Sequence, residues 1–268
     1  MCKGVLPVKV FMKNVFKYRY LLEDLTIRDL KVKYRRSLLG ILWSVLNPLL
    51  MMLVITAVFS SIFKIDVENF PIYYLTGSLI FNFFAEATSG ALVSILGNSP
   101  LIKKVYIPKF IFPLEKTLFA FVNMLFSLLA VVIMFIVLRF VPSWTIVFSP
   151  IIFIYVFVFS LGVGFFLSAI SIFFRDVIHL YSVFLTAFMY MTPIIYPESM
   201  IERMPAVVSS VIHYNPMYYY VQYFRNISMY GILPSVRDNL ICIVSALLAL
   251  LVGSLVLKKA QDKFILYI

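Results

Sequence analysis

Charge is scarce in this sequence. Only 13% of its 268 residues are Asp, Glu, Lys or Arg, whereas 63% are hydrophobic. A water-soluble protein of this size needs a far more polar surface, so the composition excludes a soluble globular protein and predicts a chain that crosses a membrane several times. The 23 basic residues lie mainly between apolar runs. This distribution argues against nucleic acid as a partner.

Cysteine and the signatures of catalysis are scarce as well. Cys2 lies at the start and Cys242 inside a late apolar run, so a disulfide between them is implausible. No glycine is followed by lysine, which excludes a P-loop for ATP. The sequence has no Gly-x-Ser-x-Gly and no Cys/His spacing typical of a metal site. We therefore expect a chain that is not an enzyme and binds no metal or cofactor of its own.

The most informative stretch begins at Arg28. Five cations fall within nine residues: Arg28, Lys31, Lys33, Arg35 and Arg36. The uncharged run 41–63 that follows is long enough to cross a bilayer as one helix. Each Lys or Arg costs about 3 kcal/mol at a helix centre, so the basic block cannot cross. The junction near Gly40 is therefore predicted to lie at the membrane surface, with the basic block on the cytoplasmic side.

Six apolar segments are predicted to span the membrane, which gives an all-α polytopic fold. They cover about 41–63, 71–97, 117–138, 146–173, 178–196 and 239–257. Segment 198–238 is less hydrophobic and rich in Tyr and Pro, which favours a partly re-entrant hairpin before the last span. We expect three parts: a cytoplasmic arm with an interfacial helix (1–40), a transmembrane domain (41–260) and a cytoplasmic tail (261–268).

The basic residues also predict the orientation. Eighteen Lys and Arg fall on the side that holds residues 1–40, loop 98–116, the turn at Arg175 and the tail, and five fall on the other side. Cytoplasmic loops carry the excess of Lys and Arg, so both termini are predicted to be cytoplasmic.

Loop 98–114 is unusual for a simple turn because it mixes lysines with apolar side chains. Such a loop either docks a cytoplasmic protein or lies on the inner leaflet of the membrane, and we favour docking. The candidate docking residues are Leu101, Ile102, Lys103, Lys104, Tyr106 and Pro108.

Two features within the apolar runs leave alternatives open. Glu86, near the middle of the second run, marks a functional site, or it is protonated or hydrogen-bonded to a neighbour such as Ser89, Thr88 or Asn82. Ser160, Gly164 and Ser168 recur every four residues, which lets helices approach closely, either within one chain or between two copies.

Aromatic residues are concentrated in segment 214–224. They either form the aromatic belt typical of membrane interfaces or a platform for sugar rings. From the residues alone the belt is favoured. The candidates for a substrate path are Trp43, Phe83, Phe84, Glu86, Tyr190, Tyr196, Tyr218 and Tyr219.

Two motifs stand at a characteristic distance from one another. The first includes Arg28, Asp29, Lys31, Tyr34, Arg35 and Arg36, followed by Gly40, Trp43 and Asn47-Pro48. The second includes Asn98, Leu101 to Lys104, Pro108 and Pro113. Together they resemble the ABC-2 type transporter permeases, in particular their polysaccharide exporter branch, which serves O-antigen, teichoic acid, capsule and rhamnose-rich chains.

The resemblance implies a half-transporter. Two permeases would form a homodimer, and two separate ATPase subunits, which bind ATP and Mg²⁺, would drive export of a lipid-linked polysaccharide across the bacterial plasma membrane. It implies that residues 99–112 receive the ATPase stroke and residues 21–39 clasp the ATPase, and it favours sugar contacts for the outer aromatics. The alternatives are an ABC-2 permease for a drug or lipid, a membrane-embedded glycosyltransferase and a secondary transporter.

Overall fold

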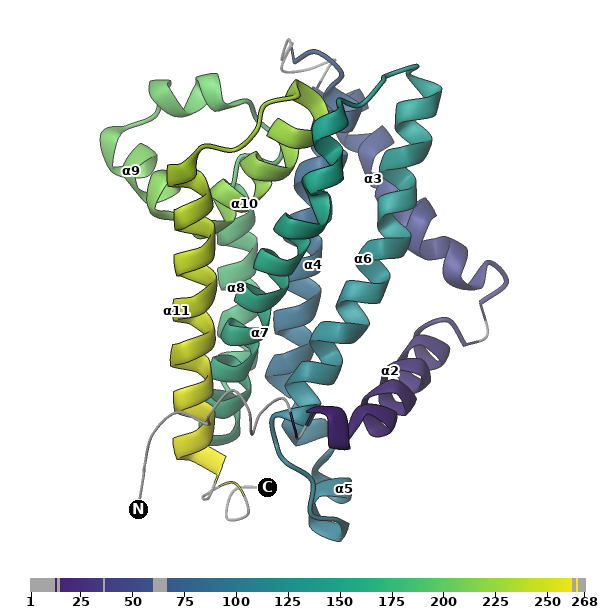
Figure 1. The fold of residues 1–268 in the computed structure, drawn as a ribbon, viewed down its shortest axis with the longest axis vertical. Helices are drawn as coiled ribbons and strands as arrows, with labels where there is room; N and C mark the ends of the chain where they lie inside the picture. The colour runs from purple at the N-terminus through teal and green to yellow at the C-terminus, as the bar shows by residue number, and fades with distance from the viewer. Residues whose placement is uncertain (1–12, 14, 36, 60–66, 262–263, 265–268) are drawn as a thin grey trace.

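The computed structural model describes residues 13, 15–35, 37–59, 67–261 and 264. Throughout these described residues the regular structure is helical, without a strand. Long helices lie side by side in a bundle, and shorter helices flank its two ends (Figure 1). The prediction of an all-α, polytopic membrane protein is confirmed.

Five helices among the described residues are long and apolar enough to cross a membrane. They are α3 (Trp43–Val58, extended by a 3₁₀ turn over Gly40–Leu42), α4 (Phe70–Gly97), α6 (Ile111–Val137), α7 (Ser149–Phe173, preceded by the 3₁₀ turn Trp144–Phe148) and α11 (Val236–Ala260).

The predicted span 178–196 is a shorter helix. Helix α8 (Val177–Tyr190) has 14 residues, and at about 1.5 Å per residue it covers roughly 21 Å of a hydrocarbon layer about 30 Å thick. It ends where the chain reaches Thr192-Pro193. Proline cannot donate a backbone hydrogen bond and disfavours helical geometry in the residue before it, which explains the stop.

Helix α4 forms the centre of the bundle. More than half of its apolar window is buried, the largest share among the five long helices. Phe84 stacks on Phe159 of α7 with ring centroids 5.6 Å apart, and Phe83 contacts Phe121 of α6 edge to face at 5.9 Å. The core therefore consists of interlocked aromatic rings from α4, α6 and α7.

Small residues bring α7 close to two neighbours. A Cβ on Gly253 of α11 would lie 2.0 Å from the carbonyl oxygen of Gly162, so glycine is required at this crossing. A Cβ on Gly164 would lie 2.8 Å from the Cβ of Ala91 on α4. The small-residue stripe of α7 thus packs within the chain, which decides between the two alternatives left open by the sequence.

The first well-described helix, α2 (Arg19–Lys33), lies at an angle beside the lower half of α6 (Figure 1). The interfacial helix was predicted over residues 21–39. Helix α2 begins two residues before that range and ends six residues before its end. Its Leu22 and Leu25 are buried, whereas Lys31 and Arg35 are exposed. Arg36 lies outside the described residues. One side of the helix therefore rests on the bundle, and Lys31 lies on its exposed side.

The segment before the last span folds into short helices: the 3₁₀ turn η4 (Glu198–Arg203), α9 (Ala206–Tyr214), α10 (Pro216–Arg225) and the π-helical turn η5 (Asn226–Tyr230). Asn215 caps α10 by accepting a 2.8 Å hydrogen bond from the backbone of Met217. Helix α10 packs against α4, α7 and α11. The bundle carries α9 and α10 at the end where α11 begins (Figure 1).

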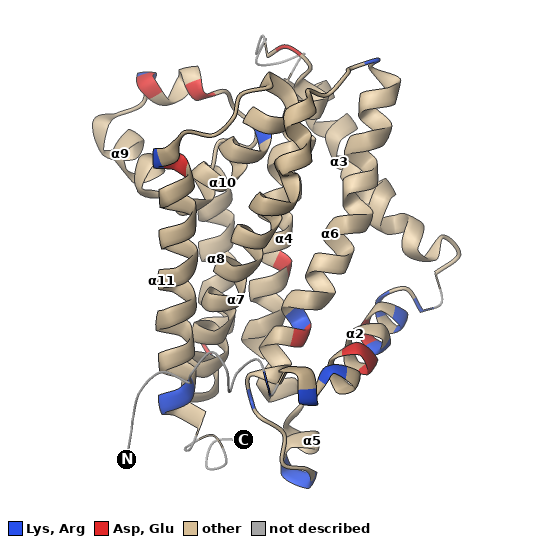
Figure 2. Ribbon diagram, viewed as in Figure 1, with Lys and Arg blue, Asp and Glu red and all other residues tan. Residues whose placement is uncertain are grey.

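Charge divides the two ends of the bundle. Lys and Arg gather around α2, around the short helix α5 (Ser99–Lys104) and at the last turn of α11 (Figure 2). The end formed by α9 and α10 carries fewer cations and several acids (Figure 2).

Candidate functional site

A cavity of about 790 Å³ lies on the side of the bundle, where α2 and α3 face α4 and α6. We call it the lateral groove. Three amides line it, Asn47, Asn82 and Asn123, together with hydroxyl groups of serine and tyrosine. Trp43 and Met51 add apolar area. The groove thus offers many hydrogen-bonding groups on helices that are otherwise apolar.

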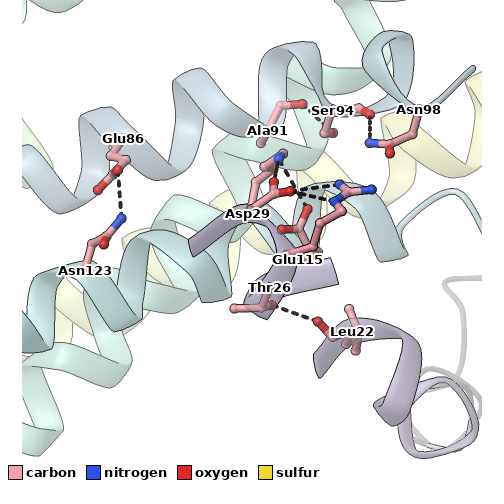
Figure 3. A network of polar contacts seen from close by, with 11 residues as sticks. Leu22, Thr26, Asp29, Glu86, Ala91, Ser94, Asn98, Glu115 and Asn123 are labelled. Atoms are coloured by element: carbon pink, nitrogen blue, oxygen red, sulfur yellow. Dashed lines mark hydrogen bonds and ion pairs between the residues drawn. The ribbon is translucent and has the colours of Figure 1, made fainter. Parts of the chain in front are cut away.

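Glu86 lies in the wall of this groove, and its partners come from other helices. Its Oε1 lies 2.7 Å from Nζ of Lys33 at the end of α2 and accepts a 3.0 Å hydrogen bond from Nδ2 of Asn123 on α6. Figure 3 shows Glu86 and Asn123 facing one another. The side chains of Lys33 and Glu86 are 40% and 33% exposed, so water screens the pair and it contributes about 1 kcal/mol or less.

Tyr34 extends the same network. Its hydroxyl hydrogen-bonds to Ser44 of α3 and donates a 3.2 Å bond to Oδ1 of Asn123. The motif residue Tyr34 therefore links the interfacial helix to two spanning helices at the groove.

A second ion-pair cluster, which includes Asp29 and Glu115 (Figure 3), fixes α2 to the first turns of α6. Asp29 pairs with Lys116 of α6 and with Arg28, whose guanidinium lies 2.9 Å away. Burial alone would raise the pKa of Asp29, but hydrogen bonds and charge from Lys116 and Arg28 outweigh it and hold the pKa below its usual value. Lys116 also lies 3.6 Å from the buried carboxylate of Glu115. A movement of α2 is thus tied to α6.

The predicted docking residues lie on a protruding loop. Helix α5 and the turn after it extend below the ends of α4 and α6 (Figure 1). Lys103 and Lys104 are exposed, Tyr106 is 84% exposed, and Leu101, Ile102 and Pro108 are half-buried. Ile107 and Phe110 are buried beneath them and hold the loop to the bundle. A partner at this end of the bundle would meet aromatic and cationic side chains first.

The predicted path residues separate into three groups. Trp43 and Glu86 line the lateral groove. Phe83 and Phe84 are buried in the core, and the ring of Phe84 packs between α7 and α8.

Tyr190, Tyr196, Tyr218 and Tyr219 form the third group, outside the lateral groove. Tyr190 is exposed at the end of α8 and accepts a 2.8 Å hydrogen bond from Tyr196 at its carbonyl oxygen. Tyr218 and Tyr219 line a separate pocket beside α10.

Arg225, one of the five cations that the sequence places on the outer side of the membrane, is fully buried. Its guanidinium donates to the carbonyl oxygens of Tyr73, Pro193 and Ile194 at 2.5–3.3 Å and lies 3.5 Å above the Tyr73 ring. Helix α8 ends before Pro193 and Ile194, so their carbonyls have no helical partner, and Arg225 supplies donors to both. Gly77 makes room, because a Cβ there would lie 2.4 Å from Nη2.

These features define a multi-pass helical membrane protein with a polar groove between its spans and a protruding loop at its basic end. The chain belongs to the ABC-2 type transporter family, whose sequence profile matches residues 20–229. The resemblance seen in the two sequence motifs is therefore confirmed. The family comprises membrane subunits of transporters, so the chain is a transport protein of this kind.

Curated relatives cover nearly the whole chain. An O-antigen export system permease protein RfbA of Klebsiella pneumoniae is 32% identical over 228 residues, which cover 84% of this chain and 87% of the relative. A second K. pneumoniae protein of that name is 29% identical over 248 residues, covering 91% and 93%. The RfbA protein of Myxococcus xanthus is 28% identical over 253 residues, covering 94% and 97%.

Proposed function

We propose that this chain is the permease subunit of an ABC exporter that moves a lipid-linked polysaccharide of the O-antigen type across the bacterial plasma membrane. Its relatives named as O-antigen export permeases support this proposal, because they match it along most of both chains. The family match supports it as well.

The observation that carries the proposal is the chemistry of the lateral groove. Polar groups inside a membrane protein are costly unless they are hydrogen-bonded to one another, to water or to a polar ligand. A sugar chain carries hydroxyl groups that donate and accept hydrogen bonds and faces that pack on aromatic rings. Asn47, Asn82 and Asn123 match the hydroxyls, and Trp43 offers a flat apolar face.

The proposal includes a second copy and a separate motor. Little of α3 is buried in the single chain, so its outer face is available to a second permease, and the lateral groove would lie beside that contact. Two ATPase subunits, which bind ATP and Mg²⁺, dock on Leu101 to Lys104, Tyr106 and Pro108. Residues 1–40 and 261–268 then lie on the cytoplasmic side of the transmembrane domain 41–260, with both termini inside.

One feature favours a second candidate, export of a drug or a lipid. Met51 and Met189 give the groove adaptable apolar area next to Trp43. The two candidates separate in a single assay on the purified complex with its ATPase. A polysaccharide exporter responds to lipid-linked glycan, whereas a drug or lipid exporter responds to hydrophobic amines or phospholipid and ignores the glycan.

The groove is tested by replacing Asn82 with leucine. Asn82 is exposed in the groove, so leucine removes hydrogen bonding without disturbing the core. Ser254→Leu on α11 is the matched control, since it makes the same polar-to-apolar change on a spanning helix outside the groove. At equal membrane abundance we expect Asn82→Leu to lower surface polysaccharide several-fold and Ser254→Leu to leave it unchanged. Equal export by both variants would contradict the role of the groove.

A further inference from the structure

A second pocket, separate from the lateral groove, lies beside α10 and the start of α11. Its volume is about 300 Å³, at the small end of the range of ligand sites. We call it the outer pocket. It lies at the end of the bundle that carries α9 and α10 (Figure 1), opposite the basic end formed by α2 and α5 (Figure 2).

One face of α10 forms the aromatic wall of the outer pocket. Tyr218, Tyr219, Gln222 and Tyr223 line it, and the spacing of four residues places them on one side of the helix. The rings of Tyr218 and Tyr219 stand at 82° with centroids 5.1 Å apart. Two flat surfaces at a right angle form a corner, and a compact ring with apolar C–H faces fits against such a corner.

Apart from Pro234, the remaining lining is polar and includes His213. Arg237 and Asp238 bring one charge of each sign, and Gln222 and Asn226 bring amides. Gln222 is held by a 3.0 Å hydrogen bond from its Nε2 to Glu198. Asp238 disfavours a phosphate, whereas an uncharged ligand rich in hydroxyl groups uses donors and acceptors alike. This chemistry favours a neutral sugar over a lipid headgroup.

The aromatic wall is fixed from behind. Tyr220 points away from the pocket, is fully buried and donates a 3.0 Å hydrogen bond to the carbonyl of Cys242 on α11. Arg225, at the end of the same helix, is anchored on α4 as described above. A site whose side chains stand on an immobile helix loses less conformational entropy on binding.

We propose that the outer pocket is a second glycan subsite, which holds a short neutral stretch of the polysaccharide as it leaves the transmembrane region. This inference rests on the proposed function. In this proposal Tyr218, Tyr219 and Tyr223 contact the sugar, whereas Tyr220 only stabilises the helix.

Export in cells tests the subsite through Tyr219. The variants are Tyr219→Leu, which removes the ring, and Tyr219→Phe, which keeps it. The matched control is Tyr214→Leu, because Tyr214 is 88% exposed on α9 and does not line the outer pocket. Expression is titrated so that every variant is compared at equal membrane abundance. We expect Tyr219→Leu to lower surface polysaccharide at least about three-fold, with Tyr219→Phe and Tyr214→Leu near the parent level.

Binding to the purified full-length chain in lipid nanodiscs provides the second measurement. The probe is the oligosaccharide released by mild acid from the cells' own surface polysaccharide, and glycerol phosphate represents a lipid headgroup. Saturation-transfer NMR should show contact with the oligosaccharide that weakens in Tyr219→Leu and not in Tyr214→Leu. Binding of glycerol phosphate alone, or oligosaccharide binding that is equal in both variants, would overturn the proposal.

The subsite and the proposed function fail differently. If deleting the whole chain leaves surface polysaccharide unchanged, the proposed function is wrong. If deletion abolishes it while Tyr219→Leu exports like Tyr214→Leu, only the subsite is wrong. The variant Tyr219→Trp separates the subsite from an aromatic belt. If the tyrosines form only a belt, this variant should export normally. If Tyr219 contacts a sugar ring, the larger side chain should lower export.

Discussion

Replacing Arg225 with leucine should strongly destabilise the half of the bundle that carries α10. The guanidinium is fully buried and makes four hydrogen bonds to three backbone carbonyls at 2.5–3.3 Å. Leucine leaves the Ile194 carbonyl without this donor and the Pro193 carbonyl with only a 3.5 Å contact from the Tyr73 hydroxyl, whereas the Tyr73 carbonyl keeps a 3.0 Å bond from Thr76. Each buried acceptor that loses its donor costs about 1–3 kcal/mol. Because neighbouring losses overlap, we expect the free energy of unfolding to fall by about 3–5 kcal/mol.

The space beside Arg225 makes the prediction sharper. A Cβ at Gly77 would lie 2.4 Å from Nη2 of Arg225, so Gly77→Ala should cost about 1–3 kcal/mol by overpacking. When Arg225 is already leucine, the clash with the guanidinium is gone. We therefore expect the alanine to cost much less in that background, which gives a coupling of about 1–3 kcal/mol in a double-mutant cycle.

The assay is unfolding of the detergent-purified chain by heat and by denaturant, followed by fluorescence-detected size exclusion. Arg203→Leu is the control, because Arg203 is exposed on η4, and it should change stability by less than about 0.5 kcal/mol. The reasoning is refuted if Arg225→Leu lies within about 1 kcal/mol of the parent. It also fails if Gly77→Ala costs the same in both backgrounds.

Three further predictions concern packing, docking and the groove. Gly253→Ala should lower the unfolding temperature sharply, because its Cβ would lie 2.0 Å from a backbone oxygen of α7. Gly97→Ala is the control and should not lower it, since nothing lies within 4 Å of that position. Equal unfolding temperatures of the two variants would contradict the close crossing. Leu101→Asp should reduce co-purification of the ATPase, since about 2 kcal/mol of apolar burial is lost, and full recovery would argue that the loop lies on lipid. Glu86→Gln should change the free energy of unfolding by about 1 kcal/mol or less because its ion pair is exposed to water, so a larger loss would contradict that screening.

Apolar runs were sufficient to predict most of the fold, because a bilayer demands long uninterrupted helices. The starts and ends of α4, α7 and α11 follow from where charge and proline occur. The length of α8 did not follow from hydropathy, which continues past Tyr190. The helix ends there although the sequence stays apolar, because Pro193 disfavours helical geometry in Thr192.

The candidate site was only partly predictable. Trp43 and Glu86, two of the residues predicted for a substrate path, both line the lateral groove. The partners of Glu86 come from α2 and α6, far away in sequence. Arg225 was missed because its neighbours in sequence, Phe224 and Asn226, do not show whether it faces water or the backbone carbonyls of another segment. The face of α10 depends on the helix register, which places Tyr219 and Tyr223 together and turns Tyr220 inward.

The most direct test of the proposed function is reconstitution. The full chain and its ATPase subunit are placed in liposomes whose outer leaflet contains the lipid-linked glycan from the same cells, and only vesicles with the ATPase facing outward are scored. The account predicts that ATP and Mg²⁺ move the glycan inside, where an added lectin cannot reach it, and that vesicles without the permease show no transfer. Glycan that stays accessible to the lectin in the complete, ATP-hydrolysing complex would contradict the account.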